Sequence, residues 1–160
     1  MALELRPATR ADAPLILDFI RGLAAYEHLE SEVSATREQL EQTLFPPDAR
    51  PAAECLLAFQ DGVPAGFAVF FPTFSTFLAR PGLHLEDLFV KPDYRGRGIG
   101  RALLQRVARV ARDRGCGRLE WTVLDWNRPA IDFYETLGAR RLPEWQLCRV
   151  DGAALEQLAP

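Results

Sequence analysis

A glycine-rich loop stands between two apolar stretches in the second half of the chain. Its residues are Arg95, Gly96, Arg97, Gly98, Ile99, Gly100 and Arg101. A helix that begins in such a loop leaves about four backbone N–H groups without partners, and its dipole adds roughly half a positive charge. Glycine has no side chain to keep a phosphate away, and the arginines supply charged donors. The loop therefore predicts an anion site at a helix start.

The spacing of these glycines excludes two common nucleotide-binding motifs. The dinucleotide fingerprint requires G-x-G-x-x-G, whereas residues 96–100 read G-x-G-x-G. The phosphate-binding loop of many nucleotide hydrolases ends in Gly-Lys-Ser/Thr, and this loop does not. Glycines also punctuate ordinary turns, so the loop alone is consistent with a flexible helix start and solvated arginines.

Two carboxylates interrupt the apolar sequence LHLEDLFV, residues 83–90. Burying Glu86 or Asp87 in a strand is unfavourable unless a partner or a ligand satisfies the charge. Neighbouring side chains of a regular strand point to opposite faces, so we expect one carboxylate in a cleft and the other paired elsewhere. The pattern favours a functional or a paired role, and a purely structural role for Asp87 stays open.

A tyrosine and an asparagine further along the chain are also chemically capable. Tyr134 follows Phe133 in DFYETLG, and with an ordinary pKa of about 10 it is protonated and able to donate at neutral pH. On pattern alone it is equally a half-buried packing residue. Asn127 precedes a helix with Pro129 in its first turn, which favours an Asn cap.

The elements that position these residues follow from the hydrophobic periodicity. The pattern predicts strands over 3–6, 53–60, 64–71, 83–90, 118–126 and 144–150, helices over 9–26, 36–44, 98–115, 127–138 and 152–159, and a loop over 72–82. Thr9 with Asp12 resembles a capping box, and Asp61-Gly62 is a strong hairpin signal. This order predicts an α/β (α+β) fold, with a mixed, mostly antiparallel central sheet flanked by helices on both faces.

Bulk properties narrow the class of protein. A length of 160 residues fits a single domain over residues 1–160, and a net charge of −3 argues against a nucleic-acid partner. No apolar run reaches the roughly 20 residues of a membrane span, and the N-terminal residues lack a secretion signal. The three cysteines lack disulfide or zinc spacing, which favours small buried residues in a cytoplasmic protein. His28 and His84 have no ligand partner nearby in sequence, so we expect neither metal binding nor catalysis from them.

Two segments together resemble signatures of the GCN5-related N-acetyltransferase (GNAT) family. The first is R-x-x-G-x-G, residues 95–100, after a strand ending in LFV and before an apolar helix. The second is WNRPAIDFYETLGA, residues 126–139, with an Asn after a strand, a helix carrying Phe-Tyr, and Leu-Gly-Ala. The motifs occur in the family's order, and the resemblance covers nearly the whole chain. It implies that acetyl-CoA is the cosubstrate and that loop amides hold its pyrophosphate.

The resemblance also implies which residues contact the coenzyme. The strand that ends at Val90 pairs with the pantetheine arm, and the loop binds the pyrophosphate. The implied set is Leu88, Phe89, Val90, Arg95, Gly96, Arg97, Gly98, Ile99, Gly100, Arg101, Asn127, Pro129, Ala130 and Tyr134. Within this set, Tyr134 would be the general acid that protonates the departing thiolate.

The amine site is implied by the same resemblance. Glu86 would contact the substrate amine and take its proton directly or through water. Tyr26 and Glu27, at the end of the first predicted long helix, would line the site together with Asp87. No covalent enzyme intermediate is required.

Within the family, the chain is similar to the diamine (spermidine/spermine) and thialysine N-acetyltransferases. Residues 23–33, 85–100 and 123–139 carry this likeness. Polyamine enzymes have Asp-Pro-Trp where this chain has Phe74-Ser75-Thr76, which disfavours long polyamines. The resemblance implies acetyl transfer to the primary amine of a diamine, polyamine or lysine/thialysine-like molecule, by a homodimer. The alternatives are acetylation of a peptide or protein amine, or a non-catalytic acetyl-CoA-binding regulatory module, against which Tyr134 and the acids argue.

Overall fold

The computed structural model describes residues 2–159, which form two compact units. The first unit ends at Thr122 and the second begins at Val123. The first unit contains β1 (Leu3–Pro7), α1 (Ala13–Glu27), α2 (Arg37–Leu44), β2 (Glu54–Gln60), β3 (Val63–Ser75), β4 (Arg80–Val90), α3 (Ile99–Asp113) and β5 (Arg118–Glu120). Short 3-10 helices occupy Arg10–Asp12, Glu30–Glu32 and Pro92–Tyr94. The second unit contains α4 (Arg128–Thr136) and α5 (Gly152–Leu158).

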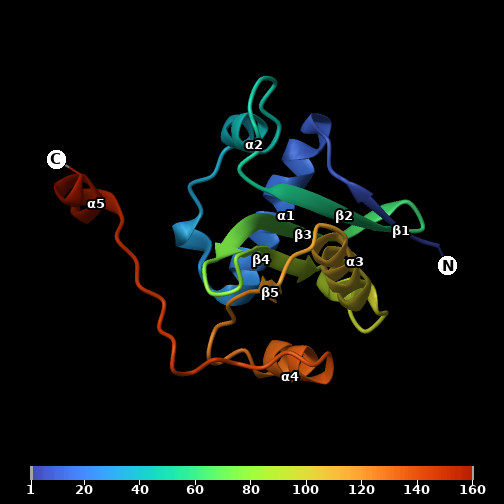
Figure 1. Cartoon of the computed structure of the whole chain (residues 1–160). Helices are drawn as coiled ribbons and strands as arrows, with labels where there is room; N and C mark the ends of the chain where they lie inside the picture. Colours follow the sequence, from blue (N-terminus) through green and yellow to red (C-terminus); the bar gives the residue numbers. More distant parts are fainter. Residues whose placement is uncertain (1, 160) are drawn as a thin grey trace. The chain divides into compact units, whose positions relative to one another are not determined.

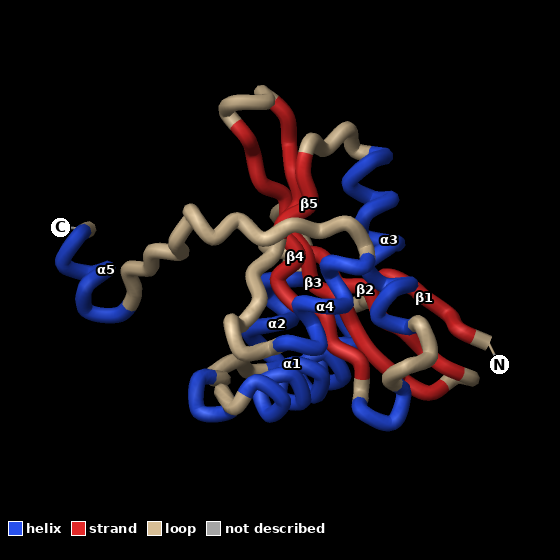
Figure 2. The backbone as a smooth tube through the Cα atoms, turned by 90° about the horizontal axis from the view of Figure 1, so that it is seen from below, coloured by secondary structure: helices blue, strands red, loops and turns tan. Residues whose placement is uncertain are grey.

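The first unit is built on one mixed sheet with the strand order β1-β2-β3-β4-β5. The first four strands pair antiparallel, and β5 pairs parallel to β4 through Gly82–His84. Helices α1 and α2 lie on one face of the sheet and α3 on the other (Figures 1 and 2). The predicted fold class, a mostly antiparallel sheet with helices on both faces, is therefore confirmed.

Two hairpins connect the antiparallel strands. Asp61 and Gly62 both have positive φ, 51° and 79°, as the two-residue turn between right-twisted strands requires. The second hairpin corrects the predicted loop over residues 72–82, because β3 continues to Ser75 and β4 starts at Arg80. Pro72 lies beyond the residues that pair with β2, and Pro81 lies just before those that pair with β5 and uses only its carbonyl, which accepts from Gly117 N–H at 2.8 Å, so both prolines are tolerated. This β3–β4 ribbon projects past the rest of the sheet (Figure 2).

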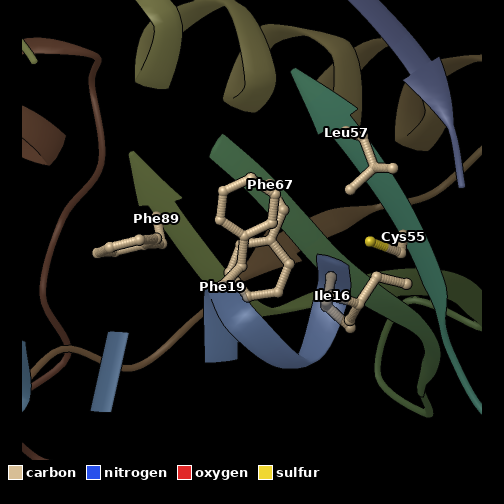
Figure 3. Packing of buried hydrophobic residues seen from close by; sticks show 7 residues of the cluster. Ile16, Phe19, Cys55, Leu57, Phe67 and Phe89 are labelled. Atoms are coloured by element: carbon tan, nitrogen blue, oxygen red, sulfur yellow. The ribbon is translucent and has the colours of Figure 1, made fainter. Parts of the chain in front are cut away.

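One cluster of the core of the first unit lies between α1 and the sheet (Figure 3), and buried residues of α3, among them Leu103 and Val107, cover the other face. Phe19 of α1 stacks on Phe67 of β3 with ring centroids 5.2 Å apart. Phe89 of β4 meets both rings edge-on at 6.4 and 6.5 Å. Aromatic pairs in these geometries contribute about 0.5–1.5 kcal/mol beyond the area they bury. The aromatic cluster therefore fixes the end of β4 against α1.

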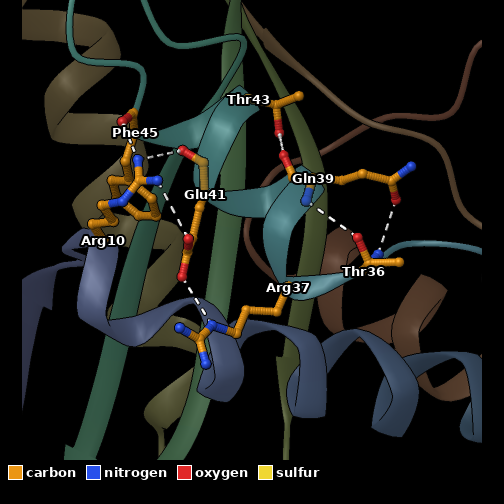
Figure 4. A network of polar contacts seen from close by, with 7 residues as sticks. All are labelled: Arg10, Thr36, Arg37, Gln39, Glu41, Thr43 and Phe45. Atoms are coloured by element: carbon orange, nitrogen blue, oxygen red, sulfur yellow. Dashed lines mark hydrogen bonds and ion pairs between the residues drawn. The ribbon is translucent and has the colours of Figure 1, made fainter.

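The predicted cap at Thr9 and Asp12 is present, although it begins a 3-10 helix and α1 starts only at Ala13. Thr9 donates its backbone N–H to Asp12 at 2.7 Å, and Arg6 binds the same carboxylate at 2.8 and 2.9 Å. Thr36 and Gln39 form a capping box at the start of α2 (Figure 4). These contacts satisfy N–H groups that a helix start leaves without acceptors.

Arg10 fixes α2 to the start of the first long helix. Its guanidinium donates to the Glu41 and Phe45 carbonyls at 3.3 and 3.1 Å and also reaches the Glu41 carboxylate (Figure 4). Arg37 binds the same carboxylate from α2 at 2.9 Å. Helix α2 is therefore held to the residues before α1 by polar contacts at its C-terminal end.

Two predicted strands are wrong in length or in existence. The strand predicted over 118–126 is limited to Arg118–Glu120, because β4 pairs with it only at Gly82–His84. Residues 144–150 form no strand in the described structure. Their alternating apolar residues fit a strand, but a strand requires a neighbour to complete its hydrogen bonds, and none of the described strands pairs with them.

Three further features concern the chemistry of the chain. No described helix has the length and apolar character needed to cross a bilayer. The described His, Cys, Asp and Glu side chains form no cluster that could hold a metal ion. Cys55 is buried, but Cys116 is half-buried and Cys148 exposed, which corrects the expectation of three buried cysteines.

Candidate active site

The glycine loop adopts the backbone conformation that only glycine takes up without strain. Gly96 and Gly98 have φ of 72° and 79°, and a Cβ built on either would meet nothing within 4 Å. Glycine is therefore required here by its backbone conformation, and the space above the loop is open. Gly98 caps α3 without any side-chain acceptor, and the first intrahelical bond runs from Ala102 N–H to the Gly98 carbonyl at 2.9 Å. The amides before Ala102 point out of the helix start, as an anion site requires.

The arginines of this loop have different environments. Arg95 donates from Nε to the Val90 carbonyl at 2.8 Å, and its guanidinium lies 4.7 Å from the Tyr26 ring centroid. It also lies 5.6 Å from the Phe89 ring. Arg97 stacks over Tyr94 at 5.4 Å. The sequence indicated charged donors for an anion, but not that Arg95 connects the loop to the ends of β4 and α1.

The end of β4 has one paired and one open edge. Val90 pairs with Gly66 of β3, where a Cβ would come 2.5 Å from the Phe89 carbonyl, so only glycine permits this close approach. On the other side, β5 pairs only with residues 82–84. Among the described strands, none pairs with that edge of residues 85–90. Leu88 and Val90 are half-buried, and Phe89 is buried in the aromatic core.

A β-bulge changes the expected directions of the two carboxylates. Val69 of β3 pairs with Asp87 and Phe70 with Leu85, so Glu86 is the extra residue. Directly paired residues share a face, which places Asp87 with Val69 on the α1 face. Glu86 lies 3.5 Å from Nε2 of His84, whose ring lies 4.9 Å from that of Phe71. The prediction that Glu86 and Asp87 point to opposite faces is therefore wrong, because it assumed a regular strand.

Glu27 brings a third carboxylate to this face. It is the last residue of α1, which ends because His28 adopts the left-handed conformation with φ 60°. Burial raises the pKa of the Glu27 carboxyl. Burial, with the charges of Glu86 and Glu27, raises the pKa of Asp87 to about 7. The charges of the three carboxylates therefore act on one another, and such a group favours a cation nearby.

The remaining predicted site residues belong to the second unit. Asn127 is buried and its side-chain oxygen accepts from Ala130 N–H at 3.4 Å, which confirms the predicted cap. Pro129 is the second residue of α4, inside the first turn, as expected. Tyr134 is half-buried on α4, with its ring 5.5 Å from that of Phe133. That these residues join the loop and the carboxylates in one site stays a prediction.

The model of the acetyltransferase (GNAT) family matches residues 22–139. This match covers most of the chain and includes the loop, the bulge and α4. The chain belongs to the GNAT family. It is therefore an N-acetyltransferase by family, and enzymes with this fold generally use acetyl-CoA.

Two relatives match over most of their length. The chain is 39% identical to the thialysine N-epsilon-acetyltransferase of Sus scrofa over 166 aligned positions, covering 97% of this chain and 96% of the relative. It is 34% identical to an L-ornithine N5-acetyltransferase of Arabidopsis thaliana, covering 97% of this chain and 87% of the relative.

Solved structures show the same GNAT fold. An integron cassette protein from the mobile metagenome of V. cholerae superposes with a TM-score of 0.79 at 27% identity, covering 99% of this chain and 98% of that protein. An aminoglycoside acetyltransferase from an uncultured soil sample superposes with a TM-score of 0.77 at 16% identity, covering 93% of this chain and 97% of that protein. At this identity, the second likeness concerns the fold alone.

Proposed function

We propose that this GNAT protein transfers an acetyl group from acetyl-CoA to the distal primary amine of a small basic amino acid or a short diamine. The carboxylate cluster at the bulge of β4 carries this proposal. An alkyl ammonium has a pKa of about 10.4, so such a substrate arrives as a cation. Glu27, Glu86 and Asp87 supply the negative charge that attracts it, and α1 ends beside them with no basic residue in its last turn. A helix C-terminus adds roughly half a negative charge.

The first unit also supports the proposed place of acetyl-CoA. Amides of the loop around Gly98 suit a pyrophosphate, and Arg97 and the exposed Arg101 are near enough in sequence to add charge. The open edge of Leu88–Val90 suits an extended pantetheine arm, which could complete the strand's hydrogen bonds. A backbone N–H at this edge would then polarise the thioester carbonyl.

The proposed reaction follows from these placements. The ammonium loses a proton, and its nitrogen attacks the thioester carbon. The C–S bond breaks when the tetrahedral intermediate collapses, and Tyr134 donates its proton to the thiolate. The nitrogen loses its second proton to solvent as the amide forms, and the Tyr134 phenolate takes a proton back from solvent. The family match spans residues 22–139 and so crosses the boundary between the units, which supports one acetyltransferase domain made from both.

The substrate class is supported by the names of two relatives and by the β3–β4 ribbon. The curated relatives act on thialysine and ornithine. At Phe74–Thr76 the ribbon carries no carboxylate that could hold a distant second cation. We therefore expect ornithine, lysine or thialysine to exceed spermidine and spermine in kcat/KM.

An amine panel tests the proposal. Thiol release from acetyl-CoA is followed with ornithine, lysine, thialysine, putrescine, spermidine and spermine, and mass spectrometry locates the acetyl group. Norvaline, which has the ornithine skeleton without the distal amine, is the matched control and should not be acetylated. The proposal fails if spermine is the best substrate, or if no amine on the panel accelerates thiol release.

A homodimer in the cytoplasm is the proposed working state. Trp145 and Leu147 are both 75% exposed in a segment whose alternation suits a strand, and a second chain would give it a neighbour. The described cysteines are all free, which suits a reducing compartment. Light scattering should give about twice the 17.9 kDa chain mass. A monomer mass at micromolar concentration would contradict the dimer.

A further inference from the structure

The bulge of β4 separates the environments of two neighbouring carboxylates. The side chain of Glu86 is 57% exposed and has His84 beside it at 3.5 Å. Asp87 pairs across the sheet with Val69, a member of the aromatic core cluster, and is half-buried. No described residue gives the Asp87 carboxylate a hydrogen bond or an ion pair. A solvated carboxylate keeps its charge, whereas a desolvated one without a partner gains most from a proton or a cation.

The groups that face Asp87 are mostly acidic or neutral. Glu27 faces it from α1, and Glu86 lies beside it on β4. Cys55 of β2 lies on the same face, and burial followed by the charge of Asp87 raises the pKa of its thiol to about 12, so it stays neutral. The nearby cations are held over aromatic rings, Arg95 over Tyr26 and Phe89, and Lys91 over Phe19 at 5.5 Å. Neither cation forms an ion pair with Asp87 among the described contacts.

We propose that Asp87, and not the neighbouring Glu86, accepts the proton of the substrate ammonium, while Glu86 and Glu27 hold the cation by charge. This inference rests on the proposed function. The proton leaves the substrate nitrogen for an Asp87 oxygen, which frees the nitrogen lone pair for attack on the thioester carbon. Asp87 returns the proton to solvent after product release, so no further reactant is needed.

The assignment gives a definite pH dependence. A general base is effective when its pKa lies near the working pH, and kcat/KM reports the ionisation of the free enzyme. Because the pKa of Asp87 is raised to about 7, mainly by burial and then by Glu86 and Glu27, the base is protonated below this pH. Therefore kcat/KM should rise with pH through about 7 and reach a plateau above it.

Three variants distinguish Asp87 from its neighbours. Asp87→Asn keeps the shape of the side chain. It should abolish the acid limb of the pH profile, which is the rise of kcat/KM through about pH 7, and should lower kcat by about 10²–10⁴-fold. Glu86→Gln should keep the limb but move it to lower pH, because the loss of a like charge lowers the pKa of Asp87. His84→Gln is the control, because His84 contacts Glu86 and not Asp87 among the described contacts, and the pH dependence should survive it.

A substrate that needs no base provides a second readout. In an analogue of the best amine that carries an aminooxy group in place of the distal amine, this group is uncharged at pH 7, so its acetylation should fall less than threefold in Asp87→Asn. An equal loss for both substrates would show that Asp87 is structural and overturn its role as the base. A limb that survives Asp87→Asn, or that disappears in Glu86→Gln or His84→Gln, would overturn it too. If the wild type is inactive with every amine, both the proposed function and the role of Asp87 are refuted. If the wild type is active but the acid limb persists in Asp87→Asn, only the role of Asp87 is refuted.

Discussion

Replacing Gly98 should separate backbone strain from coenzyme binding, because the structure contains a matched control. Gly98 and Gly62 share a φ of 79°, and a Cβ added at either meets nothing within 4 Å. Gly62 lies in the β2–β3 turn, whereas Gly98 caps α3 at the proposed pyrophosphate site. The same substitution at both positions therefore imposes the same conformational strain, but only one is at the site.

The strain sets the expected loss of stability. A non-glycine residue in the left-handed region costs about 1–2 kcal/mol. For a chain of this size, 1 kcal/mol lowers Tm by about 2–4 °C, so Gly62→Ala and Gly98→Ala should each lose roughly 2–8 °C. Both proteins should still fold, because the open space means that the new methyl group clashes with nothing.

Coenzyme binding should respond only at position 98. A side chain there occupies the space above the helix-start amides, and a hydrogen bond to a charged group contributes about 1.5–3 kcal/mol. Losing one raises Kd by roughly 10- to 100-fold, at 1.4 kcal/mol per tenfold. Gly98→Val should show at least this effect, Gly98→Ala a smaller one, and Gly62→Val none.

Calorimetry with acetyl-CoA measures the effect directly. S-acetylpantetheine lacks the pyrophosphate, so its KM should be the same in wild type and Gly98→Val. Equal acetyl-CoA affinity in folded Gly98→Val and Gly62→Val would remove the loop from the coenzyme site. A parallel loss of affinity for both donors would place the defect elsewhere than at the pyrophosphate.

Three other predictions concern single side chains. Tyr134→Phe should lower kcat by roughly 10²-fold with unchanged acetyl-CoA Kd, and a kcat within threefold of wild type when chemistry limits the rate would make Tyr134 a packing residue. Glu27→Gln should raise the KM of the amine more than that of acetyl-CoA in steady-state kinetics, and the reverse order would remove Glu27 from the amine site. Asp12→Asn should destabilise by about 1 kcal/mol at pH 7, measured by urea unfolding. Arg6 holds the pKa of the Asp12 carboxyl well below its usual range. The extra free energy of unfolding that the carboxylate gives the wild type is therefore full above about pH 3.9, the ordinary pKa, and shrinks as the pH falls below it. If wild type and Asp12→Asn differ in free energy of unfolding by the same amount at pH 7 and at pH 2, this prediction is wrong.

Local rules predicted most of the first unit. Thr9 and Asp12 form the predicted cap because a carboxylate three residues on can accept the Thr9 N–H, and Asn127 of the second unit accepts from Ala130 N–H in the same short-range way. Asp61-Gly62 fixed the hairpin because few residue pairs accept two positive φ angles. The glycine loop was predictable for the same reason.

The features that local rules did not predict depend on neighbours that are distant in sequence. The bulge at Glu86 inserts one residue into a ladder, and one residue leaves no trace in hydrophobic periodicity. Its effect on the site is large, because it puts Glu86 and Asp87 on one face. The strand predicted over 144–150 failed for a related reason, since a pattern of alternation cannot state whether a partner strand is present. The contact of Arg95 with Tyr26 joins residues 69 positions apart, beyond the range of any local pattern.

Arg95 gives the two proposed binding sites a shared component. The guanidinium that belongs to the glycine loop rests on the ring of Tyr26, next to Glu27, and its Nε holds the Val90 carbonyl. Any ligand that attracts Arg95 toward a phosphate therefore also changes the support of the helix end beside the amine. By thermodynamic linkage such an effect is reciprocal: the factor by which coenzyme changes amine affinity equals the factor by which amine changes coenzyme affinity. The strength of this coupling is thus a property that one cation–π contact can set.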